Sequence, residues 1–174
     1  KKMEAADLVA IDTETTSLSP LDAQLCGVSI SVEEGRAYYI PVRSPDPSDH
    51  LNEKEVLDAL RGVLEDAGKP KCGHNLKYDL LVLRRADVLL RGLTTPGACD
   101  SMVASYLIDS SRSSHSLDAL ALALLGRGKQ SISELIGSGK QQRSFDTVPL
   151  GAATCYAAAD ADLPIAIGIV LGEQ

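Results

Sequence analysis

Short apolar runs in the first quarter of the chain predict β-strands. They cover residues 8–12, 25–32 and 36–42, and Glu33-Glu34-Gly35 forms the polar turn between the last two. Runs of this length, flanked by turn-forming residues, are typical of strands. Because the connections are short, we expect three neighbouring strands in an antiparallel meander.

After a polar loop, the pattern changes to helical spacing. Asn52 with Glu55 three residues later has the form of a capping box. Apolar residues then recur at helical period up to Gly68, where we expect the helix to end. A short strand over 70–73 and a helix over 76–86 follow, in which Leu80, Leu81 and Leu83 are expected to face the core.

The rest of the chain is predominantly helical. Strands early in the sequence and helices later, with one crossover, indicate a mixed sheet covered by helices, an α/β fold. Further helical patterns cover residues 99–108, 116–125, 131–136 and 151–171, with Gly126 and Gly137 as stop signals.

Length and composition fit one domain. The 174 residues contain 44% apolar residues, enough for a continuous core, and no repeat divides them. No apolar run approaches the ~20 residues that span a bilayer, and the first residues lack the pattern of a signal peptide. We therefore expect an intracellular protein without a membrane partner.

The four cysteines are expected to be free thiols. They lie far apart in the sequence, without the close pairs typical of structural zinc sites. The net charge of −7 argues against a protein that holds nucleic acid mainly by neutralising phosphates. That argument weakens if several carboxylates are gathered to bind divalent cations, which reverse the local field.

Acidic residues fall at spacings that bring side chains together. Asp12 and Glu14 are two apart at the end of the first apolar run, so both leave one face of a strand. The pairs Asn75 with Asp79 and Tyr156 with Asp160 are four apart, which places each pair on one face of a helix.

Each pattern alone is more often a set of solvated charges than a site. Asp12 changes this balance because it ends the apolar run Leu8-Val9-Ala10-Ile11, where an unpaired buried charge is costly. Hard divalent ions such as Mg²⁺ or Mn²⁺ bind oxygen ligands and would remove that cost. Four carboxylates could hold two such ions, an arrangement suited to hydrolysis of a phosphodiester.

These motifs together resemble the 3′-5′ exonuclease domain of family A, or polymerase I type, DNA polymerases. The similarity covers most of the chain and includes Asp12-Thr13-Glu14-Thr15, Asn75-Leu76-Lys77-Tyr78-Asp79 and Tyr156-Ala157-Ala158-Ala159-Asp160. It extends to Arg91-Gly92, Cys99-Asp100-Ser101-Met102, Ser105-Tyr106-Leu107, Ser144-Phe145-Asp146 and Val148-Pro149-Leu150. The set specifies the tyrosine branch of the DEDD exonuclease superfamily.

The resemblance implies a ribonuclease H-like fold, a proofreading activity and specific roles. Asp12, Glu14, Asp79 and Asp160 would bind two metal ions, Mg²⁺ or Mn²⁺, with Zn²⁺ an option at one position. Tyr156 would orient the attacking water together with Glu14. The substrate would be a DNA 3′ terminus, single-stranded or frayed, in contact with Thr15, Leu18 and Asn75.

Two further expectations follow from the resemblance. The chain would be a single exonuclease domain over residues 1–174, part of a longer DNA polymerase. Ala159 departs from the family, which often has an acidic residue there, but that position is not a metal ligand. The basic residues Lys77, Arg84, Arg85 and Arg91, and the second group Arg127, Lys129, Lys140 and Arg143, are candidates for DNA contact.

Two other functions remain open. A ribonuclease of the same superfamily would use the same four carboxylates, since they do not distinguish the sugar of the substrate. A non-catalytic module that braces a polymerase would keep the fold without using the site.

Overall fold

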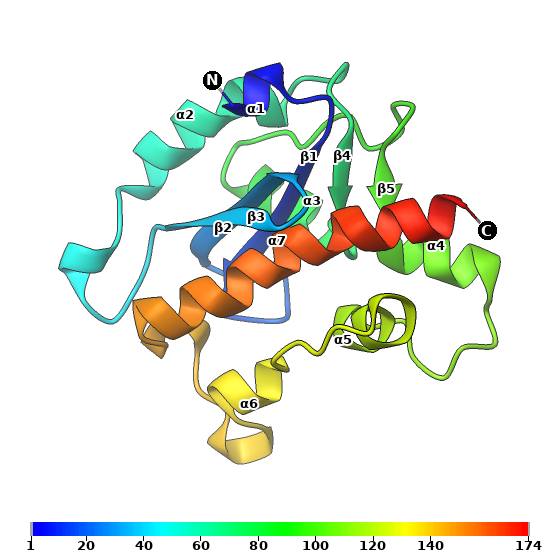
Figure 1. Cartoon of the computed structure of the whole chain (residues 1–174). Helices are drawn as coiled ribbons and strands as arrows, with labels where there is room; N and C mark the ends of the chain where they lie inside the picture. Colours follow the sequence, from blue (N-terminus) through cyan, green and yellow to red (C-terminus); the bar gives the residue numbers. More distant parts are fainter. Residues whose placement is uncertain (1, 174) are drawn as a thin grey trace.

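The computed structural model describes residues 2–173, in which five strands form a mixed sheet (Figure 1). The strand order is β3-β2-β1-β4-β5, with β1–β2 and β2–β3 antiparallel and β1–β4 and β4–β5 parallel. The strands are β1 (Val9–Thr15), β2 (Leu25–Glu33), β3 (Arg36–Pro41), β4 (Lys71–Gly73) and β5 (Cys99–Asp100).

The predicted meander is confirmed, but its first strand is longer than the apolar run. Pairing with β2 carries β1 past Asp12 to Thr15, through the partners Glu14 with Gly27 and Thr15 with Leu25. Backbone pairing therefore holds this polar segment in extended form although its residues are not apolar. As a result, Asp12 and Glu14 lie within a strand, as the spacing requires for a shared face.

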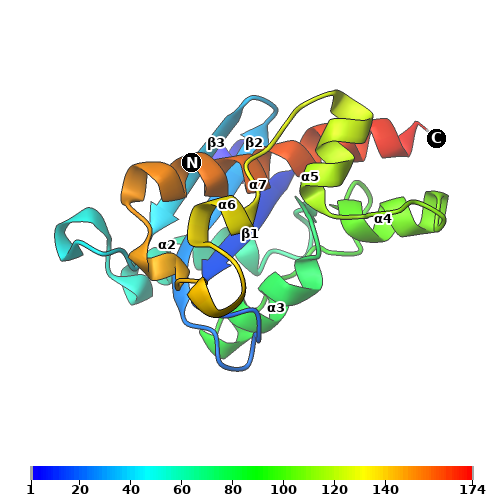
Figure 2. The same ribbon diagram turned by 90° about the horizontal axis from the view of Figure 1, so that it is seen from below.

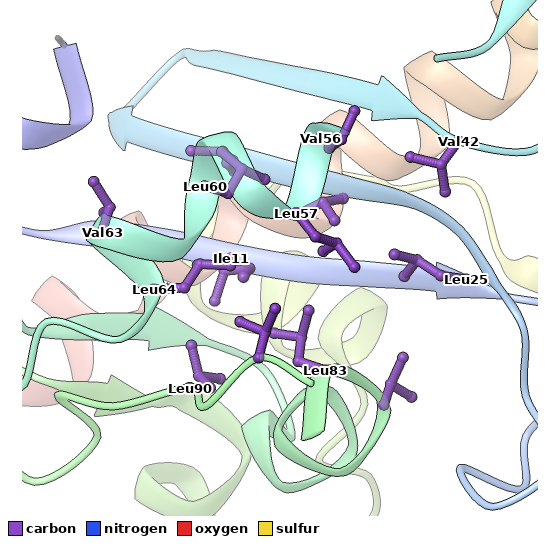
Figure 3. Packing of buried hydrophobic residues seen from close by; sticks show 14 of the residues in the cluster. Ile11, Leu25, Val42, Val56, Leu57, Leu60, Val63, Leu64, Leu83 and Leu90 are labelled. Carbon is purple, nitrogen blue, oxygen red and sulfur yellow. The ribbon is translucent and has the colours of Figure 1, made fainter. Parts of the chain in front are cut away.

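Two helices cover one face of the sheet. α2 (Glu53–Leu64) begins after Asn52, whose side chain accepts a hydrogen bond from Glu55 N at 3.2 Å, and α3 (Leu76–Arg85) follows β4. Figure 3 shows the core between them and the sheet. It contains Ile11, Leu25, Leu57, Leu60, Leu64, Leu83 and Leu90, among other residues.

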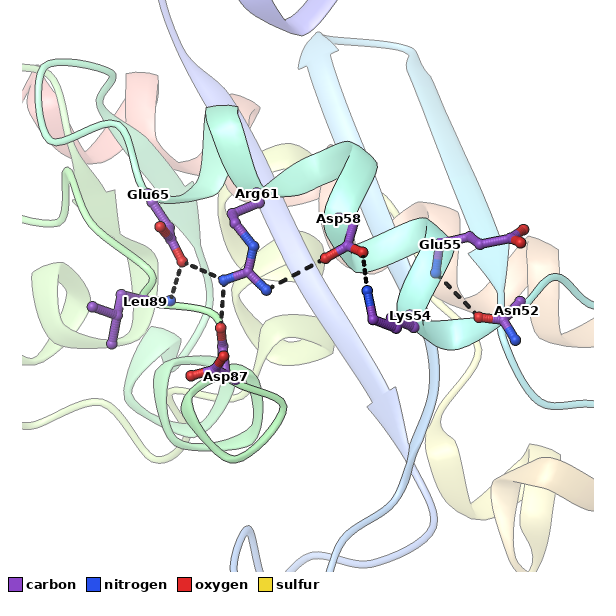
Figure 4. Close-up of polar contacts among 8 residues, drawn as sticks. All are labelled: Asn52, Lys54, Glu55, Asp58, Arg61, Glu65, Asp87 and Leu89. Carbon is purple, nitrogen blue, oxygen red and sulfur yellow. Dashed lines mark hydrogen bonds and ion pairs between the residues drawn. The ribbon is translucent and has the colours of Figure 1, made fainter.

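The helical prediction for this layer needs two corrections. α2 ends at Leu64 rather than at Gly68. Side chains then fix the segment that follows: Arg61 donates to Glu65 and to the Asp87 carbonyl, and Glu65 accepts from Leu89 N (Figure 4). In α3, Leu83 is fully buried, but Leu81 is 37% exposed. Val82 takes the expected place of Leu81, since the buried face of α3 follows 76, 79, 82 and 83.

The long helix α7 (Leu150–Gly172) covers the other face. Alternate residues of β1 divide between the two faces, so Ile11 packs under α2 and α3 whereas Ala10 packs against Ile165 of α7. α7 contacts each of β1 to β5 (Figure 1).

α7 also corrects an expectation about apolar length. Its 23 residues form the one helix in the described chain that is long and apolar enough to span a membrane by length and composition. However, it carries Asp160 and Asp162 near its middle, and Ala157, Ala161 and Ile167 are fully buried against the protein. These features are those of a core helix on a sheet.

Shorter helices complete the structure. The predicted helix over 99–108 begins later, because Cys99 and Asp100 pair with β4 as β5 before α4 (Ser101–Ile108) starts. α6 (Ile132–Ile136) lies beneath the sheet beside the first turns of α7 (Figure 2). The others are α1 (Lys2–Ala5), α5 (Leu117–Leu120), the π-helical turn η2 (Ala121–Leu125) and the 3-10 turns η1 (Pro47–Asp49), η3 (Gly139–Gln141) and η4 (Phe145–Thr147).

The buried face of α3 yields a stability prediction. Leu83→Ala should lower the free energy of unfolding by roughly 2–5 kcal/mol, because it leaves a cavity in a closed core. Urea unfolding followed by circular dichroism measures this. Leu81→Ala, on the same helix, is the control and should cost less than about 1 kcal/mol. Equal losses would contradict the assigned face of α3.

Candidate active site

Three carboxylates from two elements meet on one face of the sheet. Asp12 and Glu14 extend from β1 towards α7, and Asp160 extends from α7 towards β1. Each offers an oxygen, and these oxygens lie within 4.8 Å of one another. The fully buried Ala157 and Ala161 lie on the same helix, and their small side chains allow α7 to lie close to the sheet.

Asp79 approaches from the opposite layer. Its Oδ1 accepts hydrogen bonds from the Thr13 backbone N at 2.8 Å and from Thr13 Oγ1 at 2.7 Å, and the residue is 2% exposed. Thr13 separates Asp12 from Glu14 in β1. The structure therefore places all four predicted carboxylates around the end of one strand.

Burial dominates the electrostatics of this group. It raises the pKa of Asp12 and of Glu14 well above their ordinary values, and repulsion from the neighbouring carboxylates raises both further. Burial also raises the pKa of Asp160, and it raises the pKa of Asp79 to about 7 despite the hydrogen bonds from Thr13. Taken without a counter-ion, the site thus disfavours its fully ionised state.

One cation lies in this group. Lys129 Nζ is 2.7 Å from Asp160 Oδ1 and 3.7 Å from the centroid of the Tyr156 ring, and its side chain is 6% exposed. Sequence reasoning placed Lys129 among candidates for DNA contact and missed this ion pair. The two residues are distant in sequence, and no local pattern links a loop lysine to a particular aspartate.

Tyr156 lies one helical turn before Asp160 and is half-buried. Its ring packs against Phe145 with centroids 6.1 Å apart. Burial and the carboxylates raise the pKa of its hydroxyl, so the phenol keeps its proton at neutral pH. It is therefore a neutral hydrogen-bonding group beside the carboxylates.

An open cavity of about 910 Å³ lies over the four carboxylates. The eight residues predicted for catalysis and substrate binding all line it, and Leu18, which is 84% exposed, stands in its wall. Met102 and Ser144, from motifs of the family resemblance, also line it, and sequence reasoning did not single out other lining residues, whose signals were indistinguishable from ordinary helix and loop positions: His74, Ile132 and Gln142.

Asn75 does not lie on a helix, contrary to the sequence prediction. Its backbone has φ 63°, in the left-handed region that asparagine tolerates, and it precedes α3. Asp100 fixes this turn, because its two oxygens accept hydrogen bonds from Asn75 N at 3.0 Å and Leu76 N at 2.8 Å. The same carboxylate accepts from Met102 N at 3.0 Å and so also caps α4.

The candidate DNA-contacting bases divide into three kinds. Arg143 lines the cavity. Arg85 donates to the carbonyls of Pro20 and Ala23, and Arg127 pairs with Glu34 at 2.6 Å, so both have structural partners. The remaining exposed candidates are Lys77, Arg84, Arg91 and Lys140, whereas Lys129 has the partner Asp160.

The residues present fit divalent metal ions. The donors are carboxylate oxygens, which Mg²⁺ and Mn²⁺ prefer. Glu14 Oε1 is buried without a hydrogen-bond partner in the described structure, as expected of an atom that awaits a ligand. All four cysteines are free, and none of them is among the residues that line the cavity.

Sequence comparison places the chain among exonucleases. A family model described as 3'-5' exonuclease matches residues 1–171. DNA polymerase I of Pseudomonas aeruginosa is 40% identical over 178 residues, which cover 100% of this chain and 19% of that protein. DNA polymerase I of Rhizobium leguminosarum is 33% identical over 186 residues, which cover 96% of this chain and 18% of that protein. The chain thus spans about a fifth of the length of these relatives.

Solved structures agree in fold, which confirms the expected ribonuclease H-like architecture. Brucella melitensis NrnC with bound Mg²⁺ has a TM-score of 0.67 and 25% identity, with 97% of this chain and 73% of that chain covered. Trypanosoma brucei RNase D has a TM-score of 0.74 and 16% identity, with 97% of this chain and 58% of that chain covered. At this identity the similarity shows the fold alone. The chain belongs to the 3'-5' exonuclease family and is similar to part of the DNA polymerases I of these bacteria.

Proposed function

We propose that this domain removes nucleotides from DNA 3′ ends by metal-dependent hydrolysis, with release of nucleoside 5′-monophosphates. The observation that carries the proposal is the meeting of Asp12, Glu14 and Asp160 within 4.8 Å, with Asp79 nearby, beneath an open cavity. The family model and the polymerase relatives support the direction of attack and the substrate.

Asp12, Glu14, Asp79 and Asp160 would hold two divalent ions, Mg²⁺ or Mn²⁺, with Zn²⁺ an alternative at one position. Such ions lower the pKa of water and stabilise negative charge on phosphate oxygens. The carboxylates fix the place of these ions relative to the cavity. The Mg²⁺ bound to Brucella melitensis NrnC supports this metal class.

The protein's own groups position the reactants. Tyr156 keeps its proton, because burial raises its pKa, so its hydroxyl can direct a water molecule without competing as a base. Glu14, whose buried Oε1 has no hydrogen-bond partner in the described structure, lines the same cavity and would hold that water from a second direction.

The cavity wall would hold the end of the strand. Leu18 is exposed enough to pack against a terminal base, and Thr15 and Asn75 would contact the terminal nucleotide. The sequence has one Phe, five Tyr and no Trp, which are too few aromatic side chains to stack on many bases. The domain would therefore contact only the last few nucleotides. A single-stranded or frayed 3′ end fits this description.

The larger context is also a proposal. Because the relatives are whole DNA polymerases, we infer that residues 1–174 act as a single proofreading domain beside the remainder of a polymerase chain. The bacterial source of these relatives supports action inside the cell, where DNA is replicated and repaired.

Two aspartates on α7 give a matched test of the site. Asp160→Asn should reduce shortening of a 5′-labelled single strand in Mg²⁺ by on the order of 10³-fold, because it removes a charged metal ligand. Asp162→Asn is the control: Asp162 faces the turn between β2 and β3, where it accepts from Gly35 N at 2.7 Å. Its products should match wild type on a gel. A full ladder from Asp160→Asn would exclude the proposed site.

A ribonuclease of the same superfamily is the second candidate, supported by the fold similarity to Trypanosoma brucei RNase D. We expect matched DNA and RNA oligonucleotides, mixed in one reaction, to show faster loss of the DNA. Separate 5′ labels on the two strands give the ratio of rates directly. Faster loss of RNA would favour the ribonuclease, and no loss of either strand would favour a non-catalytic module.

The metal-free domain should lose stability as pH rises. Asp79 has a folded-state pKa of about 7, above its ordinary value. Its contribution to the free energy of unfolding is therefore fully present below about pH 4 and is lost as the pH rises from there to about 7. Relative to Asp79→Asn, the wild-type free energy of unfolding in EDTA should fall across this window, by at most about 4 kcal/mol. Urea unfolding at several pH values measures it.

Added Mn²⁺ should remove most of this pH dependence, because the ion favours the ionised carboxylates. In EDTA, the free energy of unfolding of wild type relative to Asp79→Asn could instead stay constant with pH or rise with pH. Either result would contradict the electrostatics assigned to the site.

A further inference from the structure

Lys129 is a buried cation at the centre of the carboxylate group. Its side chain is 6% exposed, its Nζ lies 2.7 Å from Asp160 Oδ1, and the ammonium lies over the ring of Tyr156. A lysine seldom gives up this much hydration without a specific anionic partner. The Lys129–Asp160 ion pair is thus a buried part of the site and differs from the ion pairs of the exposed surface.

Its charge acts on more than one carboxylate. Lys129 lowers the pKa of Asp12, of Glu14 and of Asp160, in each case against the effect of burial. These residues are the ones whose oxygens lie within 4.8 Å of one another. The lysine therefore supplies part of the neutralisation that a metal ion would supply.

A lysine and a metal ion would compete for the same oxygen. A divalent ion bound to Asp160 Oδ1 at about 2.1 Å would lie within about 5 Å of an ammonium in this position. Repulsion between them would be strong in a site of low dielectric constant. Metal binding is therefore more favourable when the Lys129 ammonium moves away.

The surrounding loop allows such a movement. Lys129 lies between η2 and α6, after Gly126 with φ 64° and Gly128, whose missing side chain faces open space. Arg127 ties the loop to Glu34, so the backbone can stay in place while the lysine side chain turns. A second cavity of about 300 Å³ offers room, and it is lined by Lys129 itself with Gln130, Cys155, Ala159 and Leu163, among others.

We propose that Lys129 is a resident counter-ion of the carboxylate cluster and is displaced when a divalent metal ion binds. In the metal-free protein it holds Asp160 against β1, and metal binding drives its side chain away from Asp160 towards the second cavity. The inference rests on the proposed metal-dependent function. It adds that metal affinity is set partly by the cost of removing this lysine.

The first test measures Mn²⁺ binding by titration calorimetry without DNA. Lys129→Met removes the charge and keeps a long apolar side chain, so it should bind Mn²⁺ roughly tenfold more tightly than wild type. Lys54→Met is the control, because it removes the same charge from a side chain that is 83% exposed on α2. Its affinity should equal that of wild type. Equal or weaker binding by Lys129→Met would overturn the proposal.

The second test follows Lys129 in the wild-type protein and so does not depend on a variant that folds. Brief acylation of lysines, analysed by peptide mass spectrometry, should modify Lys129 slowly in EDTA and several-fold faster in saturating Mn²⁺. Lys54 serves as the internal reference. Unchanged modification of Lys129 would show that the lysine stays in place, contrary to the proposal.

These measurements separate failure of the inference from failure of the metal site. A wild-type protein that binds no Mn²⁺ would reject both. A wild-type protein that binds Mn²⁺ and degrades DNA, with Lys129→Met no tighter and Lys129 equally protected, would reject the counter-ion role and leave the proposed function intact.

Discussion

Repulsion among carboxylates that share one buried region is the constraint on which the rest of this structure depends. Asp12, Glu14, Asp79 and Asp160 converge at the end of an apolar strand, and burial raises the pKa of each. Such a group is stable only if protons, a cation or directed hydrogen bonds offset the charge. Thr13 supplies hydrogen bonds to one of the four, and Lys129 supplies a cation to another.

The packing of α7 follows from this requirement. The helix must bring Asp160 close to β1, and a row of alanines permits that approach where larger side chains would hold the helix away. Further along, Gly168 lies where a Cβ atom would be 3.2 Å from Cys99 Sγ, so the helix is also close to β5. Leu163 and Ile167 then anchor α7 to α5 through apolar contacts. The same helix is thus both the cover of the sheet and the carrier of two site residues.

Asp100 positions the starts of two other helices, α3 and α4. By accepting from Asn75 N, Leu76 N and Met102 N, it joins the start of α3 to the start of α4 across the parallel strands β4 and β5. This junction fixes the direction of α3, and with it the approach of Asp79 to Thr13. A residue outside the cavity therefore sets the geometry within it.

Local patterns in the sequence determined the meander, the helix cap at Asn52, and the strand spacing that aims Asp12 and Glu14 to one side. They could do so because hydrogen bonds between near neighbours and a period of two or 3.6 residues leave a direct trace in sequence. The motifs and their family resemblance also identified eight residues that all line the cavity.

Only the tertiary structure decided the exposure of Leu81, the length of β1, the left-handed turn at Asn75 and the partner of Lys129. Each depends on an element distant in sequence: the sheet under α3, the pairing with β2, the cap from Asp100 and the approach of α7 to a loop. Contacts of this kind are set by how whole elements pack, and the chemistry of a single residue does not encode which distant residue it will meet.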